Sequence, residues 1–242
     1  MDINLVEIWQ HMGMAVRAVV VVLTLQAVAC IAVIIDRLLM LSISRTRTRK
    51  FVEQASAQPQ GLSAERLLKL AEEAKGSHLA SFLANGLRAY VELKAKGHGG
   101  ERAAELTRRA LERKAEPLSR ELNRGMNVLA STGSTAPFVG LLGTVLGIMH
   151  AFKLIQAGGS GGIATIGPAI AEALIVTGYG LTVAIPVVLT FNWLSGKLAG
   201  YEGDILNAAG DLLDRLEIGG EIMPGRAPTA EAAAEAPVLA AT

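Results

Sequence analysis

The feature that most constrains this chain is a stretch of seventy-two residues, from Gly125 to Gly196, which carries only two formal charges, Lys153 and Glu172. A membrane-spanning helix needs about 20 consecutive apolar residues. The stretch is long enough for two such helices, and Lys153 falls where a turn between them is expected. The sequence therefore predicts two membrane helices joined by a short turn.

Glu172 is exceptional because it lies inside the second apolar run and not at its edge. An ionisable group at membrane depth costs roughly 2.5–3.5 kcal/mol, and it usually faces a bundle interior or a water-filled cavity. A carboxyl group in this position indicates a role in ion movement.

A third apolar run, eighteen residues long, lies between Arg17 and Asp36 and just suffices for a membrane span. The residues before it include Asp2 and Glu7, and the run lacks an Ala-x-Ala exit, so a cleaved signal peptide is not expected. The basic cluster 45–50 that follows is typical of the cytoplasmic side. We therefore expect a retained membrane helix.

These runs predict an all-α membrane protein with three transmembrane helices and long helices that extend into the cytoplasm. Of 23 Lys and Arg residues, 18 lie between Arg37 and Arg124, so the positive-inside rule predicts a periplasmic N-terminus and a cytoplasmic C-terminus. The predicted segments are a short periplasmic N-terminus (1–17), transmembrane helix 1 (18–36), a cytoplasmic helical region (37–124), transmembrane helix 2 (125–152), a periplasmic turn (153–168), transmembrane helix 3 (169–196), a cytoplasmic helix (197–222) and a disordered tail (223–242).

Within the cytoplasmic region, apolar residues recur at helical spacing in three segments. The first begins near Ser63, the second covers residues 78–96, and the third covers residues 101–123. Gly125 is the only strong break before transmembrane helix 2, which favours one helix that continues from the cytoplasm into the membrane. Pro- and Ala-rich sequence after Met223 predicts disorder.

Composition argues against several function classes. The net charge is +1, so no basic field for nucleic acid is present, and one cysteine with four scattered histidines forms no metal-binding pattern. The sequence contains no Gly-x-Ser-x-Gly or Walker motif, and the glycine-rich run 140–147 has no lysine at phosphate reach. We expect neither an enzyme nor a bound cofactor.

Each of the last two apolar runs carries a stripe of small residues at helical spacing, with one threonine in it. Small residues let membrane helices approach closely. The threonines have two interpretations, because they can bond carbonyls of their own helix or line a polar path. The first stripe is Gly133, Pro137, Gly140, Thr144 and Gly147, and the second is Ala169, Ala173, Thr177, Gly180 and Ala184.

The depth of the two threonines favours the polar path. At 1.5 Å per residue, Thr144 lies about 24 Å and Thr177 roughly 22 Å from the cytoplasmic side of the hydrocarbon core. Glu172 lies one to two turns beyond them. Pro137 and Pro186 each remove a backbone hydrogen bond inside a helix and predict kinks.

Several segments closely resemble the TolQ/ExbB/MotA family of proton-channel motor subunits. These are residues 143–152 (GTVLGIMHAF), 170–177 (IAEALIVT), 184–186 (AIP) and Asn192, and the similarity extends to Asp36-Arg37 and the three-helix plan. Length and the short N-terminus resemble TolQ more than ExbB forms with an outer extension.

The resemblance implies a homopentamer in the bacterial inner membrane, around two copies of a single-span TolR/ExbD-like subunit that carries a membrane Asp. Protons are the coupling ion, and an envelope-spanning effector receives the work. Thr144, Thr177 and Glu172 correspond to the proton pathway of the family, and Pro137 and Pro186 to its helix prolines. We further expect the stripes to line a pore, with helix 1 facing lipid and close packing at Gly140, Gly143, Gly147 and Gly180.

Three function classes compete at this stage. The leading hypothesis is a subunit that converts proton motive force into mechanical work for Tol-Pal, TonB-type transport or gliding motility. The alternative is a non-conducting structural scaffold of an envelope complex, for which Glu172 would be a liability. A membrane enzyme is the third class, and the missing motifs argue against it.

Overall fold

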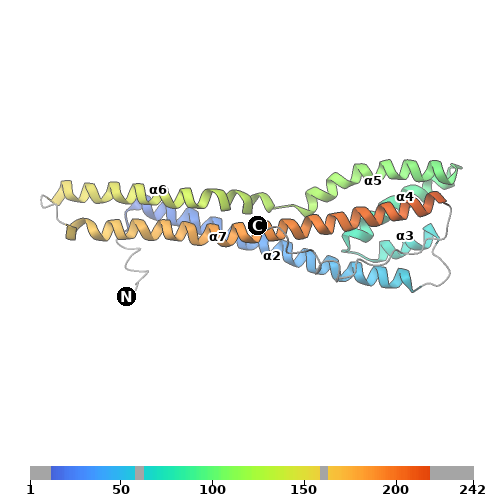
Figure 1. The fold of residues 1–242 in the computed structure, drawn as a ribbon, viewed down its shortest axis with the longest axis horizontal. Coiled ribbons are helices and arrows are strands. Elements are labelled where there is room, and N and C mark those ends of the chain that lie inside the picture. Colours follow the sequence, from blue (N-terminus) through green and yellow to red (C-terminus); the bar gives the residue numbers. More distant parts are fainter. Residues whose placement is uncertain (1–11, 58–62, 159–162, 219–242) are drawn as a thin grey trace, which may run out of the picture. The chain divides into compact units, whose positions relative to one another are not determined.

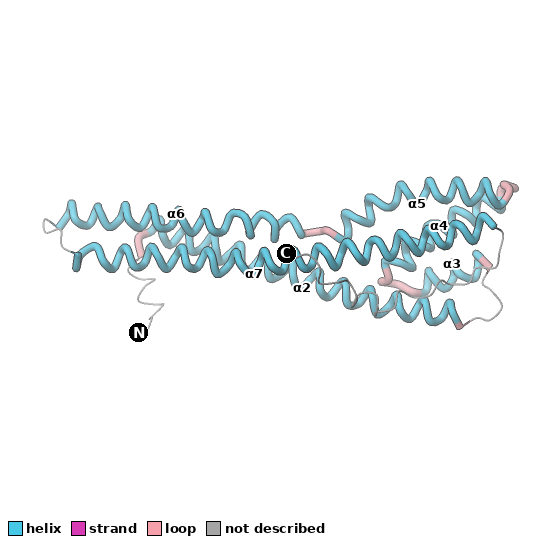
Figure 2. Tube along the Cα trace, in the orientation of Figure 1, coloured by secondary structure: helices cyan, strands magenta, loops and turns pink. Residues whose placement is uncertain are grey.

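The computed structural model describes residues 12–57, 63–158 and 163–218, and within them it contains helices and no strand. Figures 1 and 2 show that helix follows helix along the chain, joined by short connections. The helices are α2 (Met14–Ser56), α3 (Ala64–Glu73), α4 (His78–Ala95), α5 (Gly100–Leu122), α6 (Met126–Gly158) and α7 (Ile163–Ile218).

Three helices are long and apolar enough to cross a membrane, within Met14–Ser56, Met126–Lys153 and Ile166–Glu217. The all-α fold with three such helices, predicted from the apolar runs, is confirmed. The chain divides into two compact units, which are described separately. We call residues 12–36 and 124–196 the apolar unit, and residues 37–123 and 197–218 the polar unit.

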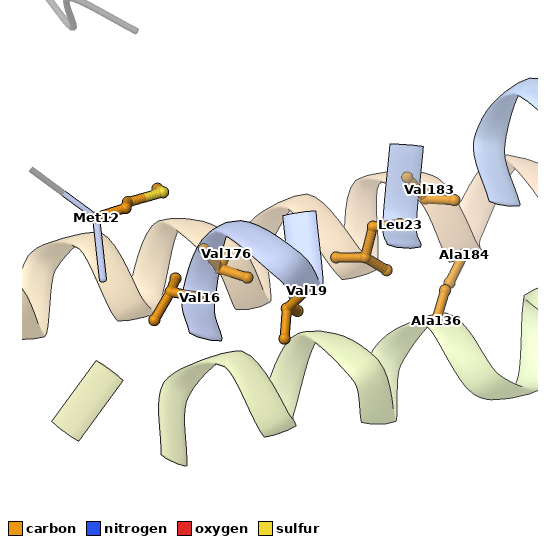
Figure 3. Close-up of a cluster of buried hydrophobic side chains, with 8 residues drawn as sticks. All are labelled: Met12, Val16, Val19, Leu23, Ala136, Val176, Val183 and Ala184. Atoms are coloured by element: carbon orange, nitrogen blue, oxygen red, sulfur yellow. The ribbon is translucent and has the colours of Figure 1, made fainter. Parts of the chain in front are cut away.

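The core of the apolar unit is formed by side chains from α2, α6 and α7, drawn in Figure 3. Val19 and Leu23 of α2 are buried beside Ala136 of α6 and Val176 of α7. A second cluster joins Cys30, Leu129 and Val187. One face of α2 is therefore a packing surface for the other two helices.

The remaining faces of the apolar unit expose large apolar side chains. On α2 these include Leu25 and Val28, on α6 Phe138, and on α7 Leu189. Phe138 is 71% exposed, an arrangement that is costly in water and suited to lipid or to a neighbouring subunit. Only one side of α2 is therefore available to face lipid, as expected for helix 1, because its other side is buried against α6 and α7.

The polar unit begins its short helices with serine caps. Ser63 Oγ accepts from the backbone N–H of Arg66, as the sequence predicted for this helix start, and Ser77 Oγ accepts from that of Ala80. α3 packs against α4, and α4 packs against α5. On the surface of α4, the hydrogen bond from Lys96 and its charge lower the pKa of the Glu92 carboxyl.

Arg37 closes the C-terminal end of α5. Its guanidinium is buried and donates to the backbone oxygens of Glu121 (2.9 Å) and Leu122 (3.3 Å). The last carbonyls of a helix have no partner within it, and a cation complements the negative end of the helix dipole. Arg37 of the Asp36-Arg37 pair noted in the sequence therefore has a structural role.

The expectation of one helix running from residue 101 into transmembrane helix 2 is wrong. α5 ends at Leu122, and α6 begins at Met126. Gly125 between them has a φ of 81°, in the left-handed region that a helix cannot use. A Cβ at this glycine would also lie 3.1 Å from Val33 Cγ1.

The other helix bounds also differ in detail from the predicted segments. α6 reaches Gly158 and α7 starts at Ile163, so helical structure extends into the range predicted as a turn. α7 continues to Ile218, so residues 197–218 of the predicted helix 197–222 belong to the same helix as the predicted transmembrane helix 3, and residues 219–222 lie outside the described residues. The predicted tail 223–242 lies outside the described residues, and the membrane boundaries stay predictions.

Gly125→Ala should destabilise the protein by about 1–2 kcal/mol, because the left-handed conformation is unfavourable for alanine and its Cβ would crowd the side chain of Val33. Gly203→Ala is the control, since a Cβ there meets nothing within 4 Å. Thermal unfolding of both variants in nanodiscs measures the difference. Equal midpoints for Gly125→Ala and the wild type would contradict this account of the helix break.

Candidate functional site

The two stripes of small residues meet each other in the contact between α6 and α7. A Cβ added to Gly180 of α7 would lie 2.8 Å from the backbone oxygen of Ala136 and 3.0 Å from Cα of Gly140. Real Cβ atoms essentially never come closer than 3.0 Å to another atom. The two helix backbones therefore touch at this level, and Gly180 has no space for a side chain, while a Cβ on Gly140 would lie only 3.2 Å from Cα of Thr177.

The contact continues along α6 in both directions. A Cβ on Gly143 would lie 2.5 Å from Val176 Cγ1, and a Cβ on Gly147 would lie 2.6 Å from Ala173 Cβ. On the other side, a Cβ on Gly133 would meet Val188 Cγ2 at 2.6 Å. Close approach of this kind replaces the hydrophobic drive that lipid does not supply.

Thr177 links the two helices at the closest point. Its Oγ1 donates to the backbone oxygen of Gly140 at 2.8 Å. Thr144 lies four residues further along α6, about one helical turn away, and its Oγ1 donates to the backbone oxygen of Leu141 at 2.7 Å. The structure thus brings the two predicted threonines to neighbouring levels of one helix contact.

The hydrogen bonds of these two hydroxyls determine which further partners they can bind. Each hydroxyl has one hydrogen and two lone pairs, and both threonines use the hydrogen on a backbone carbonyl. Their lone pairs remain available to accept from water or from a protonated carboxyl. Carbonyl bonding and a polar path are therefore not exclusive alternatives, because one hydroxyl can serve both.

Glu172 lies on α7 beside the end of this contact. The next residue, Ala173, is buried and would meet a Cβ on Gly147. The Glu172 side chain is half-buried, and it has no hydrogen bond or ion pair with any residue that the structure describes.

The two predicted prolines lie inside continuous helices, Pro137 in α6 and Pro186 in α7. Each proline leaves one carbonyl of the preceding turn without its usual backbone partner. Pro137 is one turn from Gly140 and Gly133, so this local weakness falls within the close contact of α6 with α7.

Sequence reasoning missed the polar side chains of α2 that reach the other membrane helices. Thr24 Oγ1 lies 3.1 Å from the hydroxyl of Tyr179, and Gln26 Nε2 lies 3.5 Å from Thr135 Oγ1. The side-chain oxygen of Gln26 is buried and has no partner among the described residues. Thr24 and Gln26 interrupt the first apolar run, which was the signal available in the sequence.

The match that decides the family covers residues 74–205, more than half of the chain, and it includes the whole α6–α7 contact. The chain belongs to the MotA/TolQ/ExbB proton channel family. The resemblance drawn from the segments around Thr144 and Glu172 is thereby confirmed. Family membership and the three apolar helices support a multi-pass protein of the inner membrane.

Individual relatives carry the name biopolymer transport protein ExbB. The protein of Salmonella typhimurium (strain LT2) is 30% identical over 213 residues, which are 88% of this chain and 86% of that protein. The protein of Pseudomonas putida is 44% identical over 103 residues, covering 43% of this chain and 31% of that one. The protein of Neisseria gonorrhoeae is 46% identical over 99 residues, or 41% and 45% of the two chains.

Replacing Gly180 by alanine should force α6 and α7 apart, because the three nearest atoms that the new Cβ meets all belong to the backbone. We expect a loss of about 1–3 kcal/mol in stability. Gly178→Ala on the same helix is the matched control, since its Cβ would meet nothing within 4 Å.

Thermal unfolding in nanodiscs, together with cysteine cross-linking across the α6–α7 contact, provides the measurement. An unfolding midpoint and a cross-linking yield that are the same in the two variants would show that the helices tolerate separation here. The packing account would then be wrong.

Proposed function

We propose that this chain is the proton-conducting subunit of an inner-membrane motor that converts proton motive force into mechanical work across the cell envelope. The observation that carries the proposal is the α6–α7 contact, where the Thr177 hydroxyl donates to the carbonyl of Gly140 and Glu172 lies nearby without a partner among the described residues. Membership in a proton channel family supports it. A path through hydroxyls can bind and release a proton, whereas a fixed cation would repel it.

The proposed assembly follows the family resemblance. Five copies of this chain surround two copies of a single-span TolR/ExbD-like subunit, whose membrane Asp accepts the proton. The exposed apolar faces of α6 and α7, with Phe138 and Leu189 among them, supply surface for neighbours and lipid. In this arrangement the polar unit lies in the cytoplasm and the connection between α6 and α7 in the periplasm.

The names of the relatives favour one of the three possible systems. They are called biopolymer transport proteins, and the Salmonella protein matches over 86% of its length. We therefore propose TonB-type transport as the process that this subunit energises, ahead of Tol-Pal and gliding motility. An envelope-spanning effector would receive the work.

A non-conducting scaffold is the second candidate, and one observation favours it. The hydroxyls of Thr144 and Thr177 both donate to backbone carbonyls, as they would if their only role were packing. A scaffold function gives no role to the Glu172 carboxyl, which has no partner among the described residues. Substitution of the hydroxyls separates the two candidates.

Thr177→Val should leave the complex assembled and stop proton-dependent output, because valine keeps the shape of threonine and removes the hydroxyl. An interhelical hydrogen bond in a membrane contributes about 0.6 kcal/mol on average, so assembly should survive its loss. We expect the same from Thr144→Val, while Thr→Ser at either position should retain part of the output. The measurement is energy-dependent uptake in cells, alongside co-purification of the partner subunit.

Thr182→Val is the matched control for these variants. Thr182 is an exposed threonine of α7 whose hydroxyl donates to the carbonyl of Gly178. Full output from this control together with loss of output at Thr177 identifies a role beyond carbonyl bonding. Full output from the Thr144→Val/Thr177→Val double variant would favour the scaffold instead.

Glu172→Gln should impair output and preserve assembly, because the amide keeps the size of the carboxyl and cannot exchange a proton. Uptake assays and the mass of the purified complex in nanodiscs test both halves of this prediction. If output stays at the wild-type level, the Glu172 carboxyl has no role in the proton path.

A further inference from the structure

A buried cluster of polar side chains lies within the polar unit, away from the threonine contact. It joins Ser44 and Thr48 of α2, Ser77 and His78 at the start of α4, and Tyr201 of α7. Ser44 is 1% exposed, Ser77 is fully buried and Tyr201 is 4% exposed. Buried polar groups are costly unless every hydrogen finds an acceptor, so the bonds of this cluster can be counted.

Ser44 is the centre of the cluster. Its Oγ lies 2.8 Å from Nδ1 of His78 and 2.7 Å from the hydroxyl of Tyr201, and it accepts from the backbone N–H of His78 at 3.0 Å. A serine hydroxyl has one hydrogen and two lone pairs. All three of its bonding positions are therefore in use.

The chain of hydroxyls continues from Tyr201 to Ser77. Thr48 Oγ1 lies 3.3 Å from the Tyr201 hydroxyl and 2.7 Å from Ser77 Oγ. Ser77 Oγ also accepts from the backbone N–H of Ala80 at 3.1 Å. Five side chains from three helices thus form one continuous path of hydrogen bonds.

With a neutral imidazole, one direction of donation satisfies every group. Ser77 donates to Thr48, Thr48 to Tyr201, Tyr201 to Ser44, and Ser44 to Nδ1 of His78. The remaining imidazole hydrogen is then on Nε2, which lies 3.6 Å from a carboxylate oxygen of Glu121. Each hydroxyl hydrogen of the cluster then has an acceptor, and this arrangement assigns the tautomer of His78.

Protonation of His78 reverses the chain. Nδ1 becomes a donor, so Ser44 must accept from it and donate to Tyr201, which then donates to Thr48. Thr48 donates to Ser77, whose own hydroxyl hydrogen is left without an acceptor in the cluster. The protonated imidazole gains attraction to Glu121, but that side chain is 67% exposed and such a pair contributes little.

The charged groups around the cluster come from each neighbouring element. Glu121 of α5 faces the imidazole, and Arg45 of α2 lies 6.0 Å from the centre of the Tyr201 ring. Arg47 of α2 bonds the backbone oxygen of Lys75, just before α4. These contacts place one carboxylate against His78 itself and the cations further along the path.

We propose that this cluster is a pH-responsive contact, in which protonation of His78 loosens the junction of α2, α4 and α7 inside the polar unit. Histidine is the side chain whose charge ordinarily changes between about pH 5 and 8. With the orientation proposed above, the sensed compartment is the cytoplasm, so acidification of the cell would act on the motor from its inner side. The cluster shares no residue with the proposed proton path, and a pH-responsive contact is a separate function from proton conduction.

Hydrogen exchange of the full chain in nanodiscs tests the proposal. The amide of Ala80 is a direct reporter, because it donates to Ser77 Oγ of the cluster. After correction for intrinsic exchange, its opening should rise several-fold between about pH 8 and about pH 5.5 in the wild type. His78→Gln should abolish this rise, and His98→Gln, a histidine outside the cluster, should keep it.

If the opening of the Ala80 amide in the wild type does not depend on pH, the proposal is overturned. It is also overturned if the opening in His78→Gln rises on acidification as much as in the wild type. Should His78→Gln fail to fold, imidazole ¹⁵N spectra of the unaltered chain decide the matter. They should show hydrogen on Nε2 at high pH, and the ring carbon signals of Tyr201 should shift in step with protonation of His78. A hydrogen on Nδ1 at high pH, or Tyr201 signals that ignore His78, would contradict the chain. Neither assay depends on proton flux. A negative result would overturn the pH-responsive contact and would leave the proposed channel function unaffected.

Discussion

The apolar unit depends on the close approach of α6 and α7, because a bilayer core supplies no hydrophobic force that would hold two helices together. Packing has to supply that force, and it does so through glycines that bring backbone against backbone. Gly180 touches Ala136 and Gly140, and Gly143 and Gly147 receive side chains of α7. α2 completes the unit by burying one face, with Leu23 at its centre, against the pair.

The same contact fixes the groups that the proposed channel uses. Thr177 can reach the carbonyl of Gly140 because no side chain separates the two helices there. Glu172 comes five residues before Thr177 on the same helix and remains without a described partner. Packing and the proposed proton chemistry therefore draw on the same helix contact, and a change in this contact has to be tested for both.

Much of this arrangement could be predicted from the sequence, because apolar length and helical spacing are local signals. They identified the three long helices and the small-residue stripes, and the segments around Thr144 and Glu172 identified the family. The sequence could not indicate that the stripes meet each other within one chain, nor that Gly125 adopts a left-handed conformation that ends α5. The cluster of Ser44, His78 and Tyr201 was also out of reach, since its members lie up to 157 positions apart and share no periodicity.

The most direct measurement of the central claim is proton flux through the purified complex. The chain and its single-span partner are reconstituted together in liposomes that contain a pH-sensitive dye, and a membrane potential is imposed. The account predicts acidification of the lumen when both subunits are present, and none when the complex carries Thr144→Val and Thr177→Val. A complex that assembles fully and shows no flux above protein-free liposomes, or a flux that the double substitution leaves unchanged, would contradict it.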